Sequence, residues 1–393
     1  MDPLVTASTD PLLAWREEFP TLRHTLHFIS HSLGAMPRGV EASLGHYAEM
    51  WRERGIRAWE EEWFELPTRA GDVLASIIGG EGGSIGFHSN VTVAQTVALS
   101  AVDFTPPRDT LVCTAEDFPS MLYLYEGLAR RRPVKLCTVA ARAHRRVQVE
   151  DVVAAIDERT ALVAISHVLF RTAQILDLAP VVRRAREVGA LTLIDAYQSV
   201  GTVPVDVRAL GVDMLSGGSV KWLCGGPGAG YLYVRPELAS TLRPAVTGWM
   251  AHEHPFEFDS GPMQWHDGPR RFWTGTPGIP AILAARPGHE IVARVGVEAI
   301  RAKSLRQTSR MLALADEYGF PVVSPREHAL RGGTVVIDVP EAETVCHALL
   351  AADVLLDFRP GVGLRLAPHF YTRDDEVDEV MRRVREEVKR AQG

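Results

Sequence analysis

The strongest constraint on the fold is a regular alternation of short apolar runs with helical segments, which begins near residue 84. "SIGFHS" predicts a strand and "NVTVAQTVALSAV" the helix after it, and "TLVCTA" predicts a strand followed by a helix over about 119–131. Farther on, the predicted strands are "ALVAISHV", "ALTLIDAY", "VDMLSGG" and "AGYLYVRP", with a helix around "LAPVVRRAREVG". This order is typical of an α/β protein built on a parallel sheet.

The pattern changes after "GTPGIPAI". A long helical stretch runs to about Glu317 and is followed by "GGTVVIDV", "AETVCHALLAA", "VLLDFRP", "VGLRLAP" and a charged helix, which predicts a smaller α+β domain. A chain of 393 residues is long enough for two domains. We predict an N-terminal arm over residues 1–50 that joins the small domain, a large domain over 51–285 and a small domain over 286–393.

Composition narrows the classes of partner. The formal net charge of −7 provides no basic face for nucleic acid, and no apolar run is long enough to span a membrane. The N-terminal segment "MDPLVTASTDPLLAWREEFP" lacks the charged and apolar regions of a signal peptide. No metal or disulfide spacing relates the four cysteines, which are Cys113, Cys137, Cys224 and Cys346. We therefore expect a cytoplasmic protein without nucleic-acid or membrane partners.

Lys221 stands out in "VDMLSGGSVKWLCGGPGAG". Only four of the 42 basic residues are lysines, so arginine serves wherever a plain positive charge is sufficient. A lysine kept among apolar and small residues favours chemistry that arginine cannot perform, because guanidinium stays protonated and is not a nucleophile. The glycine run "GGPGAG" does not predict a dinucleotide site, because the strand "YLYVRP" follows it where a helix is required.

Two further side chains are expected at the same edge of the sheet. "LTLIDAYQ" places Asp195 at the carboxyl end of a buried strand, where open α/β sheets bind their ligands. The alternative is an aspartate that caps a helix. "EDFPSM" places Phe118 just after another strand, where its ring either stacks on a planar ligand or fills the core.

The segment "FHSNVTVAQ" predicts a strand, a polar turn and a helix that begins near Asn90, Val91 and Thr92. Free backbone N–H groups and the helix dipole make such a turn a phosphate site, and the alternative is an ordinary N-cap. Together with the lysine and the aspartate, these features meet the needs of pyridoxal 5′-phosphate. That cofactor requires an amine for its Schiff base, an acid to keep its pyridine nitrogen protonated, and donors for its phosphate.

Near the C-terminus, "DFRPGVGLRLAPHFYT" carries Arg359 and Arg365. An arginine fork binds a carboxylate through two parallel hydrogen bonds, which is a usual way to fix an amino-acid substrate. Arg365 is the preferred candidate because an apolar residue flanks it on either side. For both arginines the alternative is a structural salt bridge.

These segments resemble the fold-type I pyridoxal-phosphate enzymes of aminotransferase class V, and among them most closely the kynureninases. The matching motifs are, in chain order, "HSLGAMPRGV", "IRAWEEEWFELPTRAGD", "DFPS", "SHVLFRTAQILDL", "DAYQSVGTVPVDVRALGVDM", "SVKW", "TGWMAHEHPF" and "LDFRPGVGLRLAPHFY". The resemblance implies a large domain with a mostly parallel seven-stranded sheet flanked by helices, and a smaller α+β C-terminal domain. It also implies a homodimer whose active sites contain residues of both chains.

The resemblance implies roles for individual residues. Lys221 corresponds to the Schiff-base lysine and Asp195 to the partner of the pyridinium nitrogen. Arg365 and Ser32 correspond to substrate-binding residues, Arg365 at the α-carboxylate. The implied cofactor contacts are Val91, Thr92, Phe118, Ser166, Gln198, Trp249 and Thr276, the last two often across the dimer interface.

Three positions depart from the kynureninase pattern. Val220 stands where a tyrosine usually precedes the lysine, and Met121 stands where an aspartate is expected. Gln198 replaces a histidine and is the residue of class V aminotransferases. The predicted activity is a kynureninase-like cleavage between Cβ and Cγ of an α-amino acid. The alternatives are transamination, epimerisation or β-elimination on the same cofactor.

Other interpretations are weaker. A cysteine desulfurase is disfavoured because Cys346 lies in a helical pattern rather than on a mobile loop. A metal hydrolase would use the histidines of "AHEHPFEF", but no third ligand has convincing spacing. A cofactor-binding regulator would need a DNA-binding element, which neither the charge nor the length provides. The aromatic residues of "WEEEWFELP" either line a substrate pocket or form the apolar face of a helix.

Overall fold

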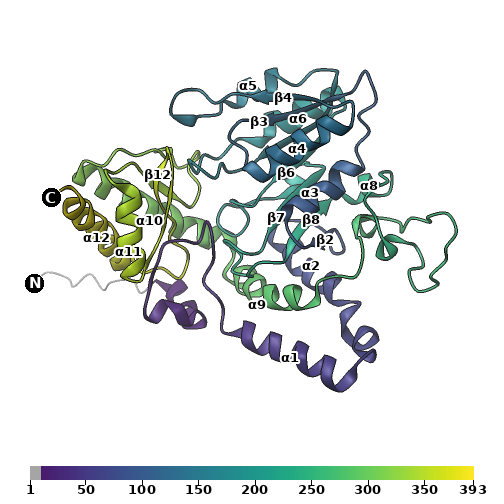
Figure 1. Ribbon diagram of the computed structural model, residues 1–393, viewed down its shortest axis with the longest axis horizontal. Helices are drawn as coiled ribbons and strands as arrows, with labels where there is room; N and C mark the ends of the chain where they lie inside the picture. The colour runs from purple at the N-terminus through teal and green to yellow at the C-terminus, as the bar shows by residue number, and fades with distance from the viewer. Residues whose placement is uncertain (1–9) are drawn as a thin grey trace, which may run out of the picture.

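The computed structural model describes residues 10–393. Its larger part is built on a seven-stranded sheet with the strand order β2-β8-β7-β6-β5-β3-β4 (Figure 1). Only β8 runs antiparallel to its neighbours. The strands are β2 (Ile85–His88), β3 (Thr110–Thr114), β4 (Lys135–Val139), β5 (Thr160–Ser166), β6 (Leu191–Asp195), β7 (Met214–Gly218) and β8 (Gly230–Val234). The expected α/β fold with a mostly parallel sheet of seven strands is confirmed.

Burial explains why these segments form central strands. Every residue of β5 is buried, as expected for a parallel strand that helices cover on both faces. The covering helices are α3 (Val91–Ser100), α4 (Pro119–Arg131), α5 (Val149–Ala154), α6 (Leu178–Val188), α7 (Val207–Leu210) and α8 (Pro236–Ala239). Helix α6 illustrates how the sequence sets the bounds of these helices. Asp177 caps its first turn, its apolar stripe is buried, and Gly189 ends it at a φ of 70°.

Three longer helices lie beyond the edge strand β2. They are α1 (Gly39–Arg54), α2 (Leu66–Ile77) and α9 (Ile279–Val295). Helix α9 packs against both α1 and α2, and α1 projects away from the rest of the molecule (Figure 1).

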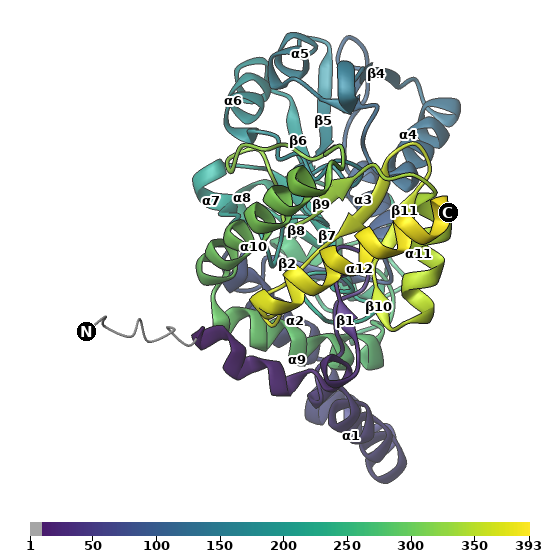
Figure 2. The same cartoon turned by 90° about the vertical axis from the view of Figure 1, so that its left-hand side faces the viewer.

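The smaller part contains a three-stranded antiparallel sheet with the order β11-β12-β9. Figure 2 shows α10 and α12 side by side across these strands. The elements are α10 (Val297–Tyr318), β9 (Val335–Ile337), α11 (Ala342–Ala351), β11 (Asp357–Arg359), β12 (Gly363–Leu366) and α12 (Asp374–Gln392).

The N-terminal segment connects the two parts. Strand β1 (Leu26–His27) pairs in parallel with β10 (Val354–Leu355) of the smaller part. A few residues later the backbone N–H of Gly34 donates to the carbonyl of Val220, 2.8 Å away. The segment therefore reaches from the small sheet to the residue that precedes Lys221.

Both predicted boundaries fall inside helices, residue 50 within α1 and residue 285 within α9. The helical stretch that the sequence predicts up to about Glu317 is two helices, α9 and α10. Gly296 separates them with a φ of 83°, a conformation that few residues other than glycine adopt.

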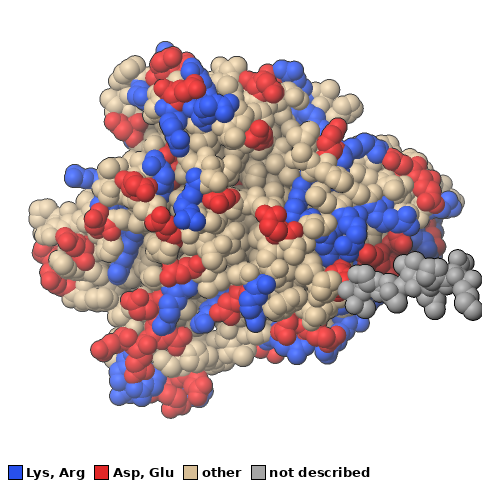
Figure 3. Space-filling model, turned by 180° about the vertical axis from the view of Figure 1, so that it is seen from behind, with Lys and Arg blue, Asp and Glu red and all other residues tan. Residues whose placement is uncertain are grey.

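The surface carries both signs of charge. On the face seen in Figure 3, basic and acidic side chains are interspersed. That face lacks the continuous basic stripe that nucleic-acid-binding proteins present. Among residues 10–393, no helix combines the length and the apolar character needed to cross a membrane.

Candidate active site

The carboxyl ends of β3, β5, β6 and β7 surround a cavity of about 560 Å³. Ligands of open α/β sheets bind at this edge. The cavity is lined by Asn90, Val91, Thr92, Val93, Phe118, Ser120, Ser166, Val168, Phe170, Asp195, Tyr197, Gln198 and Lys221. Seven residues that the resemblance assigns to the cofactor site therefore share one cavity: Val91, Thr92, Phe118, Ser166, Asp195, Gln198 and Lys221.

Lys221 lies in the loop after β7, and its amine has no hydrogen-bond or ion-pair partner among the described residues. The nitrogen lies 4.3 Å from the ring centroid of Tyr197 and 5.7 Å from that of Phe118. Burial lowers the pKa of this amine to about 8, although the charge of Asp195 opposes the change. A substantial neutral fraction is therefore present near pH 8, and the neutral amine is the nucleophilic form.

Asp195 ends β6, two residues before Tyr197. Its Oδ1 accepts a hydrogen bond of 2.9 Å from the backbone N–H of Tyr197, and no described residue donates to its Oδ2. Burial raises the pKa of this carboxyl group, because a charged carboxylate loses hydration there. A cationic ring nitrogen in the cavity would restore the favourable charge interaction.

Asn90 organises the turn between β2 and α3. Its side chain accepts a hydrogen bond from Val93 N–H at 3.1 Å and so caps the helix. The N–H groups of Val91 and Thr92 have no acceptor among the described residues. A Cβ at Gly230 would lie 2.5 Å from the Asn90 carbonyl carbon, so β8 passes under this turn only because Gly230 has no side chain. Asn90 therefore caps the helix, as one alternative expected, and the backbone N–H groups of Val91 and Thr92 still remain available to bind a phosphate.

Asp117 is a buried carboxylate whose role sequence reasoning missed. Its Oδ2 accepts the Thr114 N–H and its Oδ1 accepts the Ser166 N–H, both at 2.7 Å. Burial raises its pKa to about 6. These bonds join the ends of β3 and β5, and they fix Ser166 and Phe118 at the cavity. Its position two residues after the predicted strand "TLVCTA" was the available signal.

Arg365 lies in β12 and does not line the cavity. Its Nε and Nη2 donate to the two oxygens of Asp357 at 2.7 and 2.5 Å, and its Nη1 donates to the carbonyl of Phe170 at 2.7 Å. His31 shares Asp357 Oδ1 at 3.0 Å. Burial opposes ionisation of Asp357, but these hydrogen bonds hold its pKa well below its usual range. The structural salt bridge is thus present, and the substrate-binding role of Arg365 stays a prediction.

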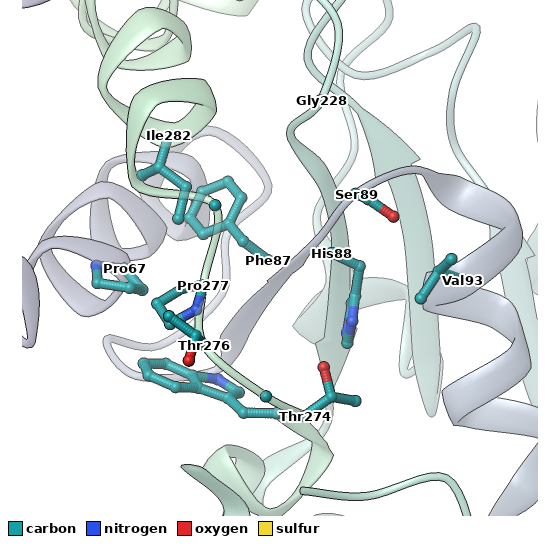
Figure 4. A pocket seen from close by; sticks show the side chains of 13 residues that line it. Pro67, Phe87, His88, Ser89, Val93, Gly228, Thr274, Thr276, Pro277 and Ile282 are labelled. Carbon is teal, nitrogen blue, oxygen red and sulfur yellow. The ribbon is translucent and has the colours of Figure 1, made fainter. Parts of the chain in front are cut away.

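Three predicted contacts lie outside the cavity of Lys221. Ser32 is in the N-terminal segment, where its backbone N–H donates to the Ile29 carbonyl. Trp249 packs against other aromatic rings. Thr276 lines a second cavity of about 330 Å³, in which His88 points toward Thr274 (Figure 4).

Gln198 lines the cavity while both ends of its amide are engaged. Its Nε2 donates to the His31 carbonyl at 3.0 Å, and its Oε1 accepts from the Trp222 indole at 3.1 Å. Gln198 thereby ties the N-terminal segment to the loop that carries Lys221.

The structure also bears on the metal-site hypothesis and on the aromatic residues of "WEEEWFELP". No group of three histidine, cysteine, aspartate or glutamate side chains within residues 10–393 is placed to hold a metal ion. Of the aromatic residues in "WEEEWFELP", Trp63 is buried in a cluster with Ala58, Leu66 and Ile279, and Trp59 packs against it edge to face. Both belong to an apolar face, and neither lines the cavity of Lys221.

Comparison with known proteins gives a consistent picture. The family model described as aminotransferase class-V matches residues 37–358. The kynureninase of Burkholderia pseudomallei (strain 1106a) is 31% identical over 392 residues, covering 96% of this chain and 92% of the relative. The kynureninase of Pseudomonas fluorescens is 30% identical over 372 residues, with coverages of 91% and 88%.

Solved structures show the fold. The apo cysteine desulfurase of Thermococcus onnurineus NA1 matches with a TM-score of 0.85 at 23% identity, covering 96% of this chain and 98% of its own. The cystine C–S lyase C-DES, in complex with cysteine persulfide, matches with a TM-score of 0.84 at 20% identity and coverages of 94% and 99%. At these identities the likeness concerns the architecture alone.

Proposed function

The chain belongs to the aminotransferase class-V family, and from this premise we propose that it is a pyridoxal-phosphate enzyme that cleaves an α-amino acid between Cβ and Cγ, as kynureninases do. One observation carries the proposal. The amine of Lys221 has no hydrogen-bond or ion-pair partner within residues 10–393, and it shares a cavity with the carboxylate of Asp195 and the N-terminus of α3. The two kynureninases that cover most of the chain at about 30% identity support the choice of reaction.

The cavity fits the cofactor group by group. Asp195 Oδ2 is available for the ring nitrogen, and the free N–H groups of Val91 and Thr92 are available for the phosphate. Phe118 is 39% exposed at the cavity wall, which leaves its ring face free to stack on a planar heterocycle. Seven-tenths or more of a small ligand is usually buried in such a pocket, and 560 Å³ is sufficient for a substituted ring with its phosphate.

Each of these residues has a definite task. Pyridoxal phosphate, when bound, supplies an electron-withdrawing ring that takes up the electron pair released at the substrate's α-carbon. Asp195 holds the proton on the ring nitrogen and keeps that ring cationic. Lys221 carries the cofactor and then, as a free amine, removes the proton from the α-carbon. Its lowered pKa suits this general-base role.

The aromatic wall of the cavity suits an aryl side chain. The rings of Phe118 and Phe170 meet edge to face, with centroids 5.1 Å apart. Arg365 donates to the backbone carbonyl of Phe170, so its guanidinium group contacts the backbone of a residue that lines the cavity. In the proposed reaction water adds to the γ-carbonyl, the Cβ–Cγ bond breaks, and alanine and an aromatic acid leave.

Desulfuration is less well supported although the matched structures include a cysteine desulfurase. A desulfurase requires a reactive thiolate, and in the small sheet region the candidate is Cys346. Cys346 is buried in α11, where burial raises its pKa to about 11. A thiol of this kind is inert at neutral pH.

The second candidate is transamination, epimerisation or β-elimination on the same cofactor. Val220 and Met121 place apolar groups where kynureninases carry a hydroxyl and a carboxylate, and Met121 is fully buried. Gln198 is committed to His31 and Trp222. Fewer polar groups are therefore free to direct water toward a γ-carbonyl.

A homodimer belongs to the proposal. Trp249 and Thr276 are implied to act across a dimer interface, and both lie outside the cavity of Lys221 in their own chain. On and just after the projecting helix α1, Trp51 is 62% exposed and Ile56 is 82% exposed. Exposed apolar groups of this size favour a protein interface. Sedimentation should show a dimer, and Trp51→Glu should increase the monomer fraction.

The test of the reaction uses protein loaded with pyridoxal phosphate and mixed with L-kynurenine or 3-hydroxykynurenine. Products are identified by mass, and borohydride reduction with peptide mapping locates the cofactor. Anthranilate-type product with alanine, and a pyridoxyl group on Lys221, support the proposal. An amino acid that changes the cofactor's spectrum without cleavage favours the second candidate, and cofactor attached to Lys135 or Lys303 contradicts both.

A further inference from the structure

Tyr197 lines the cavity, and neither the family resemblance nor the proposed function gives its side chain a task. It follows Asp195 by two residues in the turn after β6, and its backbone N–H donates to that carboxylate at 2.9 Å. The hydrogen bond fixes the backbone of Tyr197 at the cavity wall. Its side chain lines the same cavity as Lys221.

The ring of Tyr197 is the nearer of two aromatic rings at the amine of Lys221. The nitrogen lies 4.3 Å from the Tyr197 centroid and 5.7 Å from the Phe118 centroid. Both distances lie within the range of a cation–π contact, and the interaction strengthens when water is excluded. Because no described residue forms a hydrogen bond to this amine, the aromatic face of Tyr197 and the charge of Asp195 are what favour its charged form.

The phenol end of Tyr197 fits against β7 through one glycine. A Cβ at Gly218 would overlap Cζ and Oη of Tyr197. Gly218 is therefore required for space, since its φ is not in the positive range. The phenol occupies a defined position on the last residue of β7, three residues before Lys221.

The hydroxyl group of Tyr197 is available to a ligand. It has no hydrogen-bond partner among the described residues, and it is absent from the unpartnered polar atoms that are sealed inside the protein. Burial, with the charge of Asp195, raises its pKa to about 12. At neutral pH the group is therefore protonated and can donate a hydrogen bond.

We propose that Tyr197 is a further catalytic residue of this site: its ring face holds the amine of Lys221 whenever that amine is free, and its hydroxyl donates a hydrogen bond to an oxygen of the bound amino acid. Only the role of the hydroxyl group rests on the proposed function. The contact between the ring and the amine exists in the protein without cofactor or substrate.

The ring is tested in the cofactor-free protein. The apparent pKa of Lys221 is measured from the pH dependence of its labelling by trinitrobenzenesulfonate, with peptide mapping. Tyr197→Leu keeps an apolar side chain but removes the ring, so the pKa should fall by roughly 0.5 to 1.5, the equivalent of one cation–π contact. Gly218→Ala displaces the phenol and should act in the same direction, whereas Tyr197→Phe should leave the value unchanged.

Tyr233→Phe is the matched control, because it removes the hydroxyl of a tyrosine in the neighbouring strand β8 that does not line the cavity. It should match wild type in every measurement. An unchanged Lys221 pKa in folded Tyr197→Leu overturns the role of the ring. If Gly218→Ala does not fold, the Leu variant decides alone.

The hydroxyl is tested in the loaded enzyme by turnover of L-kynurenine and by exchange of the α-proton of L-alanine in deuterium oxide. Tyr197→Phe should lower kcat or the exchange rate by roughly 10- to 1000-fold, as loss of one positioned donor does, with KM nearly unchanged. Equal rates in wild type and Tyr197→Phe overturn this role. A wild-type enzyme that alters neither amino acid contradicts the proposed function and the hydroxyl's role together, while the pKa comparison still decides the role of the ring.

Discussion

Lys221 is a partly buried lysine at its cavity and Lys303 is a fully buried lysine of α10, and their surroundings differ completely. Lys303 of α10 donates to the Phe370 carbonyl at 2.6 Å and pairs with Asp10 at 2.8 Å. The amine of Lys221 lies near two aromatic rings and has no hydrogen-bond acceptor in the described part of the chain. Burial lowers the pKa of both amines. Hydrogen-bonded partners stabilise the charge of Lys303, whereas the charge of Asp195 and the two rings favour the charged form of Lys221 without a hydrogen bond. A partnered buried lysine anchors structure, and an unpartnered one keeps its reactivity.

The largest contrast is expected in activity. Lys221→Ala removes both the attachment point and the base, so turnover should fall by roughly 10³-fold or more, because the proton-transfer role alone is worth 10² to 10⁴. Lys303→Met should retain activity within about twofold, since its amine lies far from the reacting atoms. Steady-state rates on the substrate identified above measure both. Comparable losses in the two variants would contradict the division between them.

A second variant tests the acid that faces the reactive lysine. Asp195→Asn should leave the cofactor bound while turnover falls by roughly 10²- to 10³-fold, the loss expected when one preorganised electrostatic group is removed. The physical reason is that a neutral amide does not hold a proton on the ring nitrogen. Cofactor absorbance and turnover, measured on the same sample, separate binding from chemistry. Near-normal turnover would exclude this role for Asp195.

The third prediction concerns stability and pH in the cofactor-free protein. The pKa of Lys221 falls from 10.5 to about 8 on folding, so between these pH values the unfolded chain binds more protons than the folded one. Folding stability should therefore rise as pH increases from about 8 to about 10.5, by at most about 3 kcal/mol from this group. Lys221→Met should remove that increment. Urea unfolding of both proteins at several pH values measures it.

The smallest effect is expected at the anchoring lysine. Lys303→Met leaves Asp10 with Arg306 as its remaining ion-pair partner and the Phe370 carbonyl without its donor. We expect a destabilisation of about 1 to 3 kcal/mol, seen as a lower midpoint in thermal or urea unfolding. Lys389→Met, at an exposed position near the end of α12, is the control. A stability equal to that of wild type would show that Arg306 alone secures Asp10.

Sequence reasoning located residues correctly where their place in space follows from their position along one strand. Lys221, Asp195 and Phe118 each follow a recognisable apolar run, and parallel strands bring their carboxyl ends to one edge. Sequence reasoning was weaker where a side chain is held by a residue from a distant segment of the chain. The Asp357 carboxylate that occupies Arg365, and the Asp117 bridge between β3 and β5, depend on tertiary contacts that no local pattern encodes.

Two other differences have local causes. Gly296 divides a helical pattern that otherwise reads as continuous, because a single residue at positive φ redirects the chain. Tyr197 lies inside the quoted motif "DAYQ", but only its position over Lys221 and against Gly218 distinguishes a functional ring from a core aromatic residue. The direction in which the Tyr197 side chain points from its turn cannot be inferred from the residue type.

The pairing of Leu26 with Val354 has a consequence for biosynthesis. A ribosome releases β1 among the first segments and β10 among the last, so β1 waits unpaired while the large sheet assembles. Through Gly34 and His31, the same N-terminal segment completes the surroundings of the Lys221 loop. A nascent or truncated chain that ends before Val354 lacks the strand with which β1 pairs. The strand pair that anchors the N-terminal segment can therefore form only near the end of translation.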